Sequence, residues 1–172
     1  MFIGEASPDD LAAIRTLYRD AFPGEDLLPL IEALSQEHAA VVSLVAVDGA
    51  AVTGHIALTR CAIADDPQAL ALLGPLAVAP ASQARGIGTA LIRAGIDHMR
   101  AGDVTRVLVL GDPNYYGRFG FTAEDRIVPP YPLPADWRTA WQSIRLSVGA
   151  EPRAGATLIV PVPWRQPALW GP

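Results

Sequence analysis

The sequence has no lysine, a single cysteine and no long hydrophobic run, and each of these absences excludes a class of protein. Without lysine, no loop can end in the Gly-Lys-Ser/Thr of a Walker A nucleotide site. Cys61 has no second cysteine to pair with, which is typical of a reducing compartment, and is expected to be a small buried side chain rather than a nucleophile. No stretch of about eighteen residues is uniformly apolar, so no transmembrane helix is predicted.

The distribution of charge argues against a nucleic-acid partner. The net charge is −5, and all 13 basic residues are arginines that are scattered along the chain. Proteins that bind nucleic acids normally carry a basic patch, so a role directed at tRNA or DNA is disfavoured. An acidic surface would attract a cationic amine, although net charge is weak evidence for any single partner.

The length of 172 residues favours one domain with a sizeable core. We expect a single domain over residues 1–172, with its core in about residues 1–162 and a flexible tail in residues 163–172. The N-terminus, Met-Phe-Ile-Gly-Glu, lacks the basic stretch and apolar run of a secretion signal. Together with the single cysteine, this predicts a cytoplasmic protein with no membrane partner.

Helix and strand patterns follow one another in an order that predicts an α+β fold. Ser7-Pro8-Asp9-Asp10 is typical of a helix start, because serine caps, proline suits the first turn and an acid favours the N-terminus. Asp48-Gly49 is typical of a hairpin turn. After a strand at Ile3, periodicity predicts helices over residues 11–22, 26–36 and 88–101, and strands over residues 41–47, 51–59, 70–78, 104–110, 143–148 and 157–162. We expect one mixed sheet, closed by the last two strands as a pair.

The chain beyond Phe121 is rich in proline and tryptophan. Residues 129–134 must be extended and irregular, and we expect a stiff loop bordering a pocket, with a polyproline ligand for another protein as the alternative. Trp137 and Trp141 lie four residues apart, so they can share one face of a short helix. For both tryptophans, packing is favoured over stacking on a substrate.

A glycine-rich run lies between the strand pattern that ends at Val78 and the helix pattern that starts at Leu91. It reads Gln83-Ala84-Arg85-Gly86-Ile87-Gly88-Thr89-Ala90. The unpaired N–H groups and the dipole of a helix N-terminus favour an anion there, and glycine lets a phosphate approach the main chain closely. The run therefore predicts a pyrophosphate site.

The spacing within this run narrows the kind of phosphate ligand. A dinucleotide fingerprint needs a third glycine at the position of Leu91, so a nicotinamide cofactor is disfavoured. A helix that merely packs tightly on a strand is the simpler alternative to any phosphate site. The pattern that remains is Gln/Arg-x-x-Gly-x-Gly/Ala, starting at Gln83.

This pattern resembles the acyl-CoA pyrophosphate loop of the GNAT N-acetyltransferase superfamily. Pro75–Pro80 resembles the strand before that loop, and Asn114-Tyr115-Tyr116-Gly117-Arg118-Phe119-Gly120-Phe121 resembles the aromatic-Tyr-x-x-x-Gly-Phe segment of the superfamily. The resemblance covers about residues 2–121. It implies an α+β fold with a mixed, mostly antiparallel sheet flanked by helices, around a central βαβ unit that binds acyl-CoA.

The resemblance also implies an acyl-CoA-dependent N-acyltransferase. Acetyl would pass from acetyl-CoA to a primary amine by direct attack in a ternary complex, and no metal is implied. The alternatives are a non-catalytic acyl-CoA-binding sensor or interaction module, and a toxin-like enzyme that acetylates charged tRNA, which the acidic charge disfavours. A metabolite, a peptide N-terminus, a lysine and an antibiotic amine all remain open as acceptors. The oligomeric state is open as well, with a homodimer among the options.

Carried over residue by residue, the resemblance implies a binding site for the cofactor. The residues concerned are Leu76, Ala77, Val78, Gln83, Ala84, Arg85, Gly86, Ile87, Gly88, Thr89, Ala90, Asn114 and Tyr116. The first three would hold the pantetheine arm and stabilise the oxyanion, and the run from Gln83 to Ala90 would hold the pyrophosphate. Many members carry an asparagine near Gly111-Asp112-Pro113, and Asn114 is the substitute that this sequence offers.

Acyl transfer to an amine needs a base for the amine and an acid for the departing thiolate. Tyr116 aligns with the catalytic tyrosine of the superfamily, and its ordinary pKa near 10 keeps it protonated. Tyr115 is the competing candidate. Glu25, after the Pro23-Gly24 break, either accepts the amine proton, directly or through water, or caps the next helix. His55 either serves proton transfer or is a hydrogen-bonded strand histidine on the face opposite Ile56 and Leu58, which is favoured.

Overall fold

The computed structural model describes residues 1–171, and the chain divides into two compact units. The first unit comprises residues 1–58 and 74–98, and the second comprises residues 59–73 and those from 99 onward. Two long strands, β3 (Ala51–Ile63) and β4 (Asp66–Val78), contribute residues to both units. Each unit has its own secondary structure and its own buried side chains.

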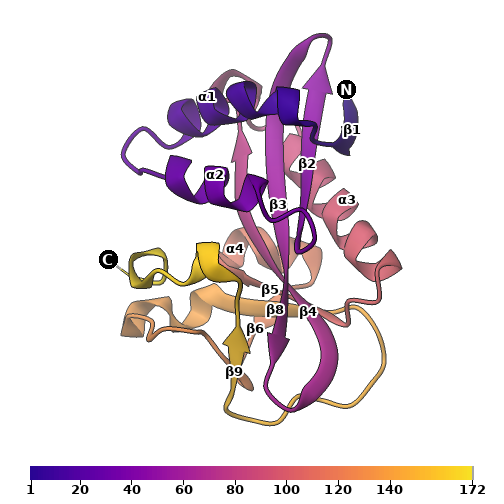
Figure 1. Ribbon diagram of the computed structural model, residues 1–172, viewed down its shortest axis with the longest axis vertical. Coiled ribbons are helices and arrows are strands. Elements are labelled where there is room, and N and C mark those ends of the chain that lie inside the picture. The colour runs from indigo at the N-terminus through magenta and orange to yellow at the C-terminus, as the bar shows by residue number, and fades with distance from the viewer. Residues whose placement is uncertain (172) are drawn as a thin grey trace. The chain divides into compact units, whose positions relative to one another are not determined.

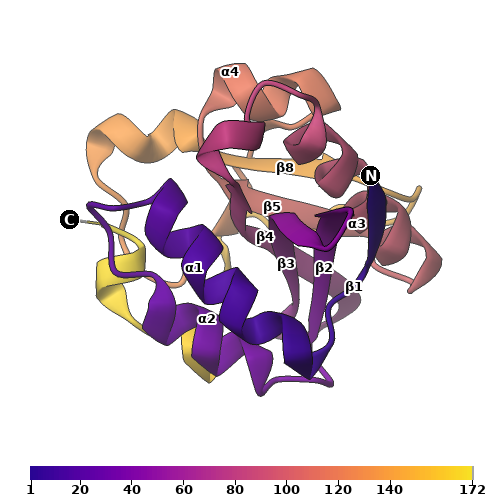
Figure 2. The same ribbon diagram turned by 90° about the horizontal axis from the view of Figure 1, so that it is seen from above.

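The first unit is built on strands in the order β1-β2-β3-β4. Its further elements are β1 (Phe2–Glu5), a 3-10 turn (Pro8–Asp10), α1 (Leu11–Ala21), α2 (Leu28–Ser35), β2 (Val41–Asp48) and most of α3 (Ile87–Ala101). β1 pairs antiparallel with β2. Figure 1 shows the elements along the chain, and Figure 2 shows α1 and α2 on one face of these strands and α3 on the other.

The two faces of β3 pack against different helices. On one face, Ile14, Leu17 and Tyr18 of α1 form a buried cluster with Ile31, Val45 and Ala77. On the other face, a Cβ added to Gly54 would lie 2.8 Å from the side chains of Ile87 and Leu91, and one added to Gly95 would lie 2.6 Å from Leu58. α3 therefore approaches the strand closely because these two glycines have no side chain.

The start of α1 agrees with its sequence signal. The backbone N–H and the hydroxyl of Ser7 both donate to Oδ2 of Asp10, at 2.7 and 2.9 Å. The helices and strands predicted over residues 11–22, 26–36, 41–47, 51–59 and 70–78 are confirmed, with β3 and β4 longer than predicted. None of the helices within residues 1–171 is long and apolar enough to cross a membrane.

The second unit continues the sheet with a parallel pair. β4 lies parallel to β5 (Arg106–Leu110), with Leu70–Leu73 opposite Arg106–Val109, and α3 connects the two strands along the chain. The order continues β5-β8-β6, where β8 (Trp141–Arg145) runs antiparallel to both neighbours. The other elements are α4 (Pro113–Tyr116), β6 (Thr122–Ala123), β7 (Ile127–Val128), β9 (Ala156–Ile159) and 3-10 helices at Gly117–Phe119, Ala135–Ala140, Val162–Trp164 and Pro167–Leu169. The predicted α+β class with one mixed, mostly antiparallel sheet is confirmed.

The closing strands differ from the prediction. The sequence pattern predicts that residues 143–148 and 157–162 pair with each other, but β8 pairs with β5 and β6, whereas β9 pairs with β3 and β7. Trp141 opens β8 instead of sharing a helix with Trp137. The reason is that strand partners are chosen by burial against distant segments, which local periodicity does not report.

The C-terminal segment also differs from the flexible tail predicted for residues 163–172. Trp170 is 1% exposed, and its indole N–H donates to the carbonyl of Trp164 at 3.0 Å. The indole of Trp164 in turn donates to Oγ1 of Thr59, also at 3.0 Å. Burying two large rings with satisfied N–H groups holds residues 163–171 against the second unit. Residue 172 lies outside the described residues.

A buried polar chain crosses the core of the first unit. His55 on β3 is 3% exposed, its Nδ1 lies 2.8 Å from the Tyr18 hydroxyl, and its Nε2 lies 2.8 Å from Oγ of Ser43. A neutral imidazole has one N–H and one acceptor nitrogen, so both can be satisfied at once. Burial lowers the pKa of His55 to about 4, and the favoured interpretation of a hydrogen-bonded strand histidine is confirmed.

This chain predicts how stability depends on pH. The pKa of His55 falls from 6.5 in the unfolded state to about 4 in the folded state. Between pH 4 and pH 6.5, the imidazole therefore binds a proton in the unfolded state but not in the folded state. The free energy of unfolding should therefore be fully retained above pH 6.5 and decrease towards pH 4. At about 1.4 kcal/mol per pH unit, this contribution is roughly 3 kcal/mol.

Urea unfolding measured at several pH values checks this prediction by comparing the wild type with His55→Gln, which hydrogen-bonds but does not titrate. His38→Gln is the matched control, because His38 is an exposed histidine in the same unit. We expect His55→Gln to have a flatter pH dependence and His38→Gln to follow the wild type. Equal slopes for all three proteins would contradict the assignment.

Candidate functional site

The glycine-rich run forms an exposed turn that leads into α3. Ala84 and Gly86 both have left-handed backbone conformations, with φ of 59° and 82°, and the helix begins at Ile87. The first α-helical hydrogen bond after the turn runs from the N–H of Ala90 to the carbonyl of Gly86, at 3.0 Å. The amides of the residues before Ala90 thus belong to the first turn, where no intrahelical acceptor exists. This geometry is that of an anion site at a helix N-terminus.

Gly86 needs to be glycine because of its backbone conformation rather than because of packing. A Cβ added there would meet nothing within 4 Å, whereas a φ of 82° disfavours other residues. The tight contact between helix and strand is made at Gly54 instead. The alternative in which the glycine of the turn merely allows close packing therefore does not apply to Gly86.

The turn is tied to the end of β4. Nε2 of Gln83 donates to the carbonyl of Val78 at 3.2 Å, and the N–H of Ser82 donates to the carbonyl of Ala79 at 2.8 Å. The N–H of Ala79 donates to the carbonyl of Thr53 on β3. Gln83 and Val78, both predicted as cofactor-binding residues, are thus held next to each other by a hydrogen bond. Ala77, the residue before Val78, is buried and only 2% exposed.

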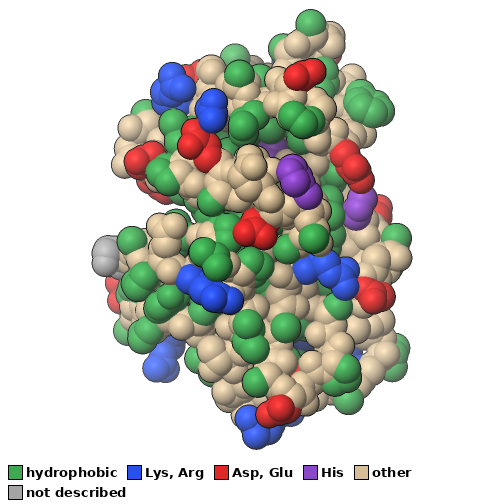
Figure 3. All heavy atoms as spheres, in the orientation of Figure 1, with side chains coloured by type: hydrophobic (Ala, Val, Ile, Leu, Met, Phe, Trp, Pro, Cys, Tyr) green, Lys and Arg blue, Asp and Glu red, His purple; other side chains and the backbone are tan. Residues whose placement is uncertain are grey.

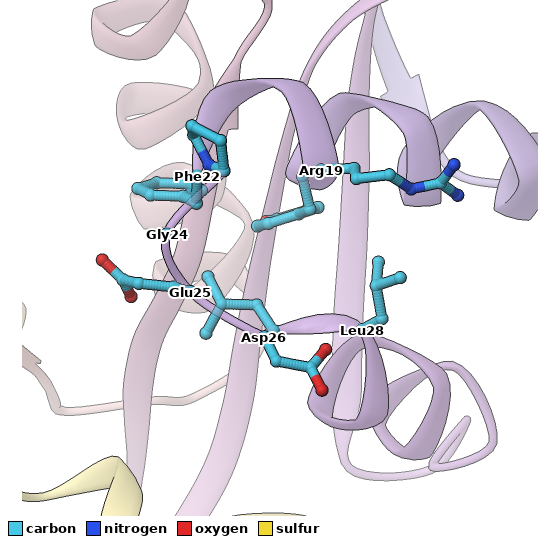
Figure 4. A pocket seen from close by; sticks show the side chains of 9 residues that line it. Arg19, Phe22, Gly24, Glu25, Asp26 and Leu28 are labelled. Carbon is cyan, nitrogen blue, oxygen red and sulfur yellow. The ribbon is translucent and has the colours of Figure 1, made fainter.

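A hollow of about 320 Å³ lies where α1 ends and α2 begins, and Figure 4 shows it from close by. Glu25 and Asp26 lie on the segment between the two helices, while Arg19 and Phe22 come from the end of α1 and Leu28 from the start of α2. The N-cap of α2 is Leu27, with no side-chain capping bond, so Glu25 does not cap the helix. Glu25 is predicted from the sequence, whereas Asp26 is not, although two adjacent acids after the Pro23-Gly24 break could have indicated both.

Tyr18 connects this hollow with the buried polar chain. Its side chain lines the hollow, is 1% exposed and hydrogen-bonds to His55. The residues that line the hollow include Tyr18 and Phe22, whose rings lie 6.1 Å apart, the acids Glu25 and Asp26, and the base Arg19.

Tyr116 is the last residue of α4, in the second unit. Asp112 fixes this short helix, because its Oδ1 accepts from the N–H of Asn114 at 2.9 Å and its carbonyl accepts from the N–H of Tyr116 at 3.0 Å. The Tyr116 ring makes edge contacts with Tyr115 and Phe121, at 5.0 and 5.7 Å between centroids. Burial, with a smaller contribution from Tyr115, raises the pKa of Tyr116 well above its ordinary value, so its hydroxyl keeps its proton at neutral pH.

The neighbouring residues have different surroundings. The guanidinium of Arg118 lies 4.6 Å above the Tyr115 ring, and Phe119 lies 5.6 Å from that ring. Burial raises the pKa of Tyr115, and Arg118 acts in the opposite direction. Asn114 is exposed, and its main chain serves the start of α4. Of the cofactor-binding residues predicted from the sequence, Asn114 and Tyr116 lie in the second unit and all the others in the first, as does Glu25.

Other reactive side chains offer little. Cys61 is buried, its thiol contacts the carbonyl of Thr59 at 3.4 Å, and burial raises its pKa to about 12, which leaves it unreactive as a thiolate. Among residues 1–171, no group of three or more His, Cys, Asp or Glu side chains is placed to hold a metal ion. On the face drawn in Figure 3, arginine and acidic side chains are interspersed.

Comparison with known sequences identifies relatives of this chain. Residues 11–121 match the model of the acetyltransferase (GNAT) family. The uncharacterized N-acetyltransferase YjhQ of Escherichia coli strain K12 is 36% identical over 139 residues, which is 77% of this chain and 77% of YjhQ. The uncharacterized N-acetyltransferase YhbS of the same strain is 29% identical over 122 residues, covering 70% of this chain and 73% of YhbS.

Solved structures give the same result for the fold. A GNAT family acetyltransferase from Brucella melitensis, in complex with acetyl-CoA, aligns with a TM-score of 0.75 and 28% identity, covering 95% of this chain and 97% of that one. Escherichia coli YhbS in complex with CoA aligns with a TM-score of 0.83 and 23% identity, covering 96% and 92% of the two chains. Because the family model matches more than half of the chain and YjhQ exceeds 30% identity over three quarters of it, this protein belongs to the GNAT family of N-acetyltransferases.

Proposed function

We propose that this protein transfers an acetyl group from acetyl-CoA to a primary amine by direct attack in a ternary complex. The observation that carries the proposal is the exposed turn from Gln83 to Gly86 at the N-terminus of α3, which has the geometry of a pyrophosphate site. The relatives seen with acetyl-CoA and CoA support this ligand for the present chain.

The turn would bind the pyrophosphate through main-chain N–H groups of residues 83–90. The left-handed conformations of Ala84 and Gly86 keep the first turn of α3 directed outward, and exposed Arg85 adds a positive side chain. A diphosphate there gains from the unpaired amides and from the helix dipole together. These contacts involve no side chain that must change its protonation state.

The end of β4 would hold the pantetheine arm. Leu76, Ala77 and Val78 follow the part of β4 that is in register with β5, and the Gln83–Val78 hydrogen bond joins them to the turn. An extended arm can pair with the main chain of a strand as another strand would. Amides at this position would also stabilise the oxyanion of acyl transfer.

Tyr116 would donate a proton to the departing thiolate. Its raised pKa keeps the hydroxyl protonated near neutral pH, so that a proton is available for the thiolate. The buried, unreactive Cys61 supports direct attack by the amine over an acyl-cysteine intermediate. The thioester supplies the acetyl group and an activated leaving group.

The hollow between α1 and α2 would receive the acceptor. Glu25 and Asp26 would attract an ammonium group and take its proton, directly or through water, and the Phe22 ring would contact its apolar part. This arrangement favours a cationic amine with a hydrophobic or flat portion. A non-catalytic acyl-CoA sensor remains the second candidate function, and it would bind CoA without releasing thiol in the presence of any amine.

A thiol-release assay with acetyl-CoA and a panel of amines tests the proposal. We expect turnover with at least one amine that is cationic and partly apolar. We also expect Glu25→Gln with Asp26→Asn to raise the KM for that amine several-fold, because an exposed carboxylate near an ammonium is worth about 0.2–1 kcal/mol. The KM for acetyl-CoA should stay unchanged. Saturable CoA binding without thiol release across the panel would favour the sensor.

Gly86→Asp tests the pyrophosphate turn. Aspartate strains the backbone at either of two glycines with positive φ, Gly86 and Gly49, but only at residue 86 would it also place a negative charge next to the diphosphate. Calorimetric titration should show CoA affinity weakened at least tenfold, by about 1.4 kcal/mol or more. Gly49→Asp is the matched control, because Gly49 has a φ of 61° and open space around it but lies in the β2–β3 hairpin. Equal CoA affinities of the two variants would refute the turn as the binding site.

Tyr116→Phe tests the general acid. Removing the hydroxyl should lower kcat roughly 10²- to 10⁴-fold, the usual contribution of general acid catalysis, while CoA affinity stays within about twofold. Tyr115→Phe makes the same chemical change one residue earlier and should retain kcat. If turnover of Tyr116→Phe is unchanged, Tyr116 is not the acid, and a loss in Tyr115→Phe would transfer the role to Tyr115.

A further inference from the structure

The ring of Tyr116 lies directly against the main chain of Gly111. A Cβ added to Gly111 would stand 2.4 Å from Cε2 of Tyr116 and 2.9 Å from its Cδ2. Both distances are shorter than carbon atoms tolerate, and the ring atoms concerned are not the free end of a flexible chain. No side chain can therefore be placed at residue 111 unless the Tyr116 ring moves.

Backbone conformation does not explain this glycine. Gly111 is not among the residues with positive φ, in contrast to Gly120 later in the same segment. It follows the end of β5, in the neighbourhood where the superfamily resemblance places an asparagine. The lack of a side chain at this position serves the approach of Tyr116.

Both polar groups of Gly111 are held by hydrogen bonds. Its N–H donates to the carbonyl of Ala140 at 2.9 Å, and its carbonyl accepts from Nε2 of Gln142 at 3.0 Å. Gln142 is 2% exposed and lies on β8 opposite Val109 of β5. A buried amide in such a position fixes the strand end that carries Gly111, since a missing donor would leave a buried carbonyl unsatisfied.

The Tyr116 ring also has aromatic neighbours. Phe121 and Tyr115 contact it edge-on, and Asp112 holds the backbone of α4. A shift of the Tyr116 ring would therefore alter its contacts with these neighbours.

We propose that Gly111 and Gln142 are positioning residues for the Tyr116 hydroxyl, and this inference rests on the proposed role of Tyr116 as general acid. A methyl group at residue 111 would displace the ring by roughly 1 Å, the difference between 2.4 Å and an ordinary contact. A misplacement of this size in a catalytic group can cost about 10²-fold in rate.

The primary experiment compares Gly111→Ala with Gly117→Ala. Gly117 lies in the same segment, has a φ of −56°, and offers open space to an added Cβ. We expect Gly111→Ala to lower kcat about 10- to 100-fold with CoA affinity within about twofold, and Gly117→Ala to match the wild type in both. A thermal melt of each variant establishes that the protein assayed is folded.

A double-mutant cycle separates positioning from general damage. If Gly111 acts through the hydroxyl of Tyr116, adding Gly111→Ala to Tyr116→Phe should lower kcat by less than about threefold further, because the group to be positioned has already been removed. A full, multiplicative loss in the double variant would overturn the inference, since it would show that Gly111 acts independently of the hydroxyl.

Gln142→Leu provides a second test if Gly111→Ala does not fold. It removes the donor to the Gly111 carbonyl and should lower kcat without changing the KM for acetyl-CoA. An unchanged kcat in the folded variant would overturn the role of Gln142. Failure of this inference can be distinguished from failure of the proposed function. If Tyr116→Phe lowers kcat but Gly111→Ala does not, only the inference fails. If Tyr116→Phe leaves kcat unchanged, the proposed role of Tyr116 fails.

Discussion

The site in the first unit depends on a backbone constraint, the left-handed turn at Ala84 and Gly86 that carries the chain from β4 into α3. Because of this turn, the first N–H groups of α3 point outward. The run from Gln83 to Gly86 is exposed and contributes no apolar surface to the core. The close packing of α3 on the sheet occurs elsewhere, at Gly54, where the lack of a side chain leaves room for Ile87 and Leu91. The close packing of α3 and the exposed turn thus depend on different glycines.

Burial shifts the pKa of two further polar side chains, His55 and Tyr116. His55 is kept neutral by desolvation and has both ring nitrogens hydrogen-bonded, so it orders the wall of the hollow through Tyr18 and is shielded from solvent. Tyr116 is kept protonated by the same physical cause. The carboxylates of Glu25 and Asp26, in contrast, stay at the rim of the hollow, where they can meet a charged ligand. One effect, the cost of charge in a buried setting, therefore keeps both the His55 and the Tyr116 side chain uncharged near neutral pH.

Local patterns predicted the elements that are stabilised by nearby residues. The Ser7–Asp10 start of α1, the hairpin at Gly49 and the helix after the glycine-rich run all rest on contacts within a few residues. The side of β3 on which His55 lies followed from strand alternation alone. The predictions that were wrong involve distant partners: β8 and β9 pair with other strands, Trp141 opens a strand, and Trp170 is buried through Trp164. Such pairings depend on surfaces formed by remote segments, which periodicity cannot identify.

The sequence by itself determined the family resemblance, the α+β order of elements and the position of the glycine-rich turn before α3, because glycine spacing and hydrophobic period are local properties that a single chain displays. Only the tertiary structure decided that Gly86 is required by its backbone conformation while Gly54 and Gly111 are required by close contact, and that Asp26 joins Glu25 at one hollow. The physical reason is that a glycine needed for a turn and a glycine needed for contact look alike in sequence. They differ only in what stands where the side chain would be.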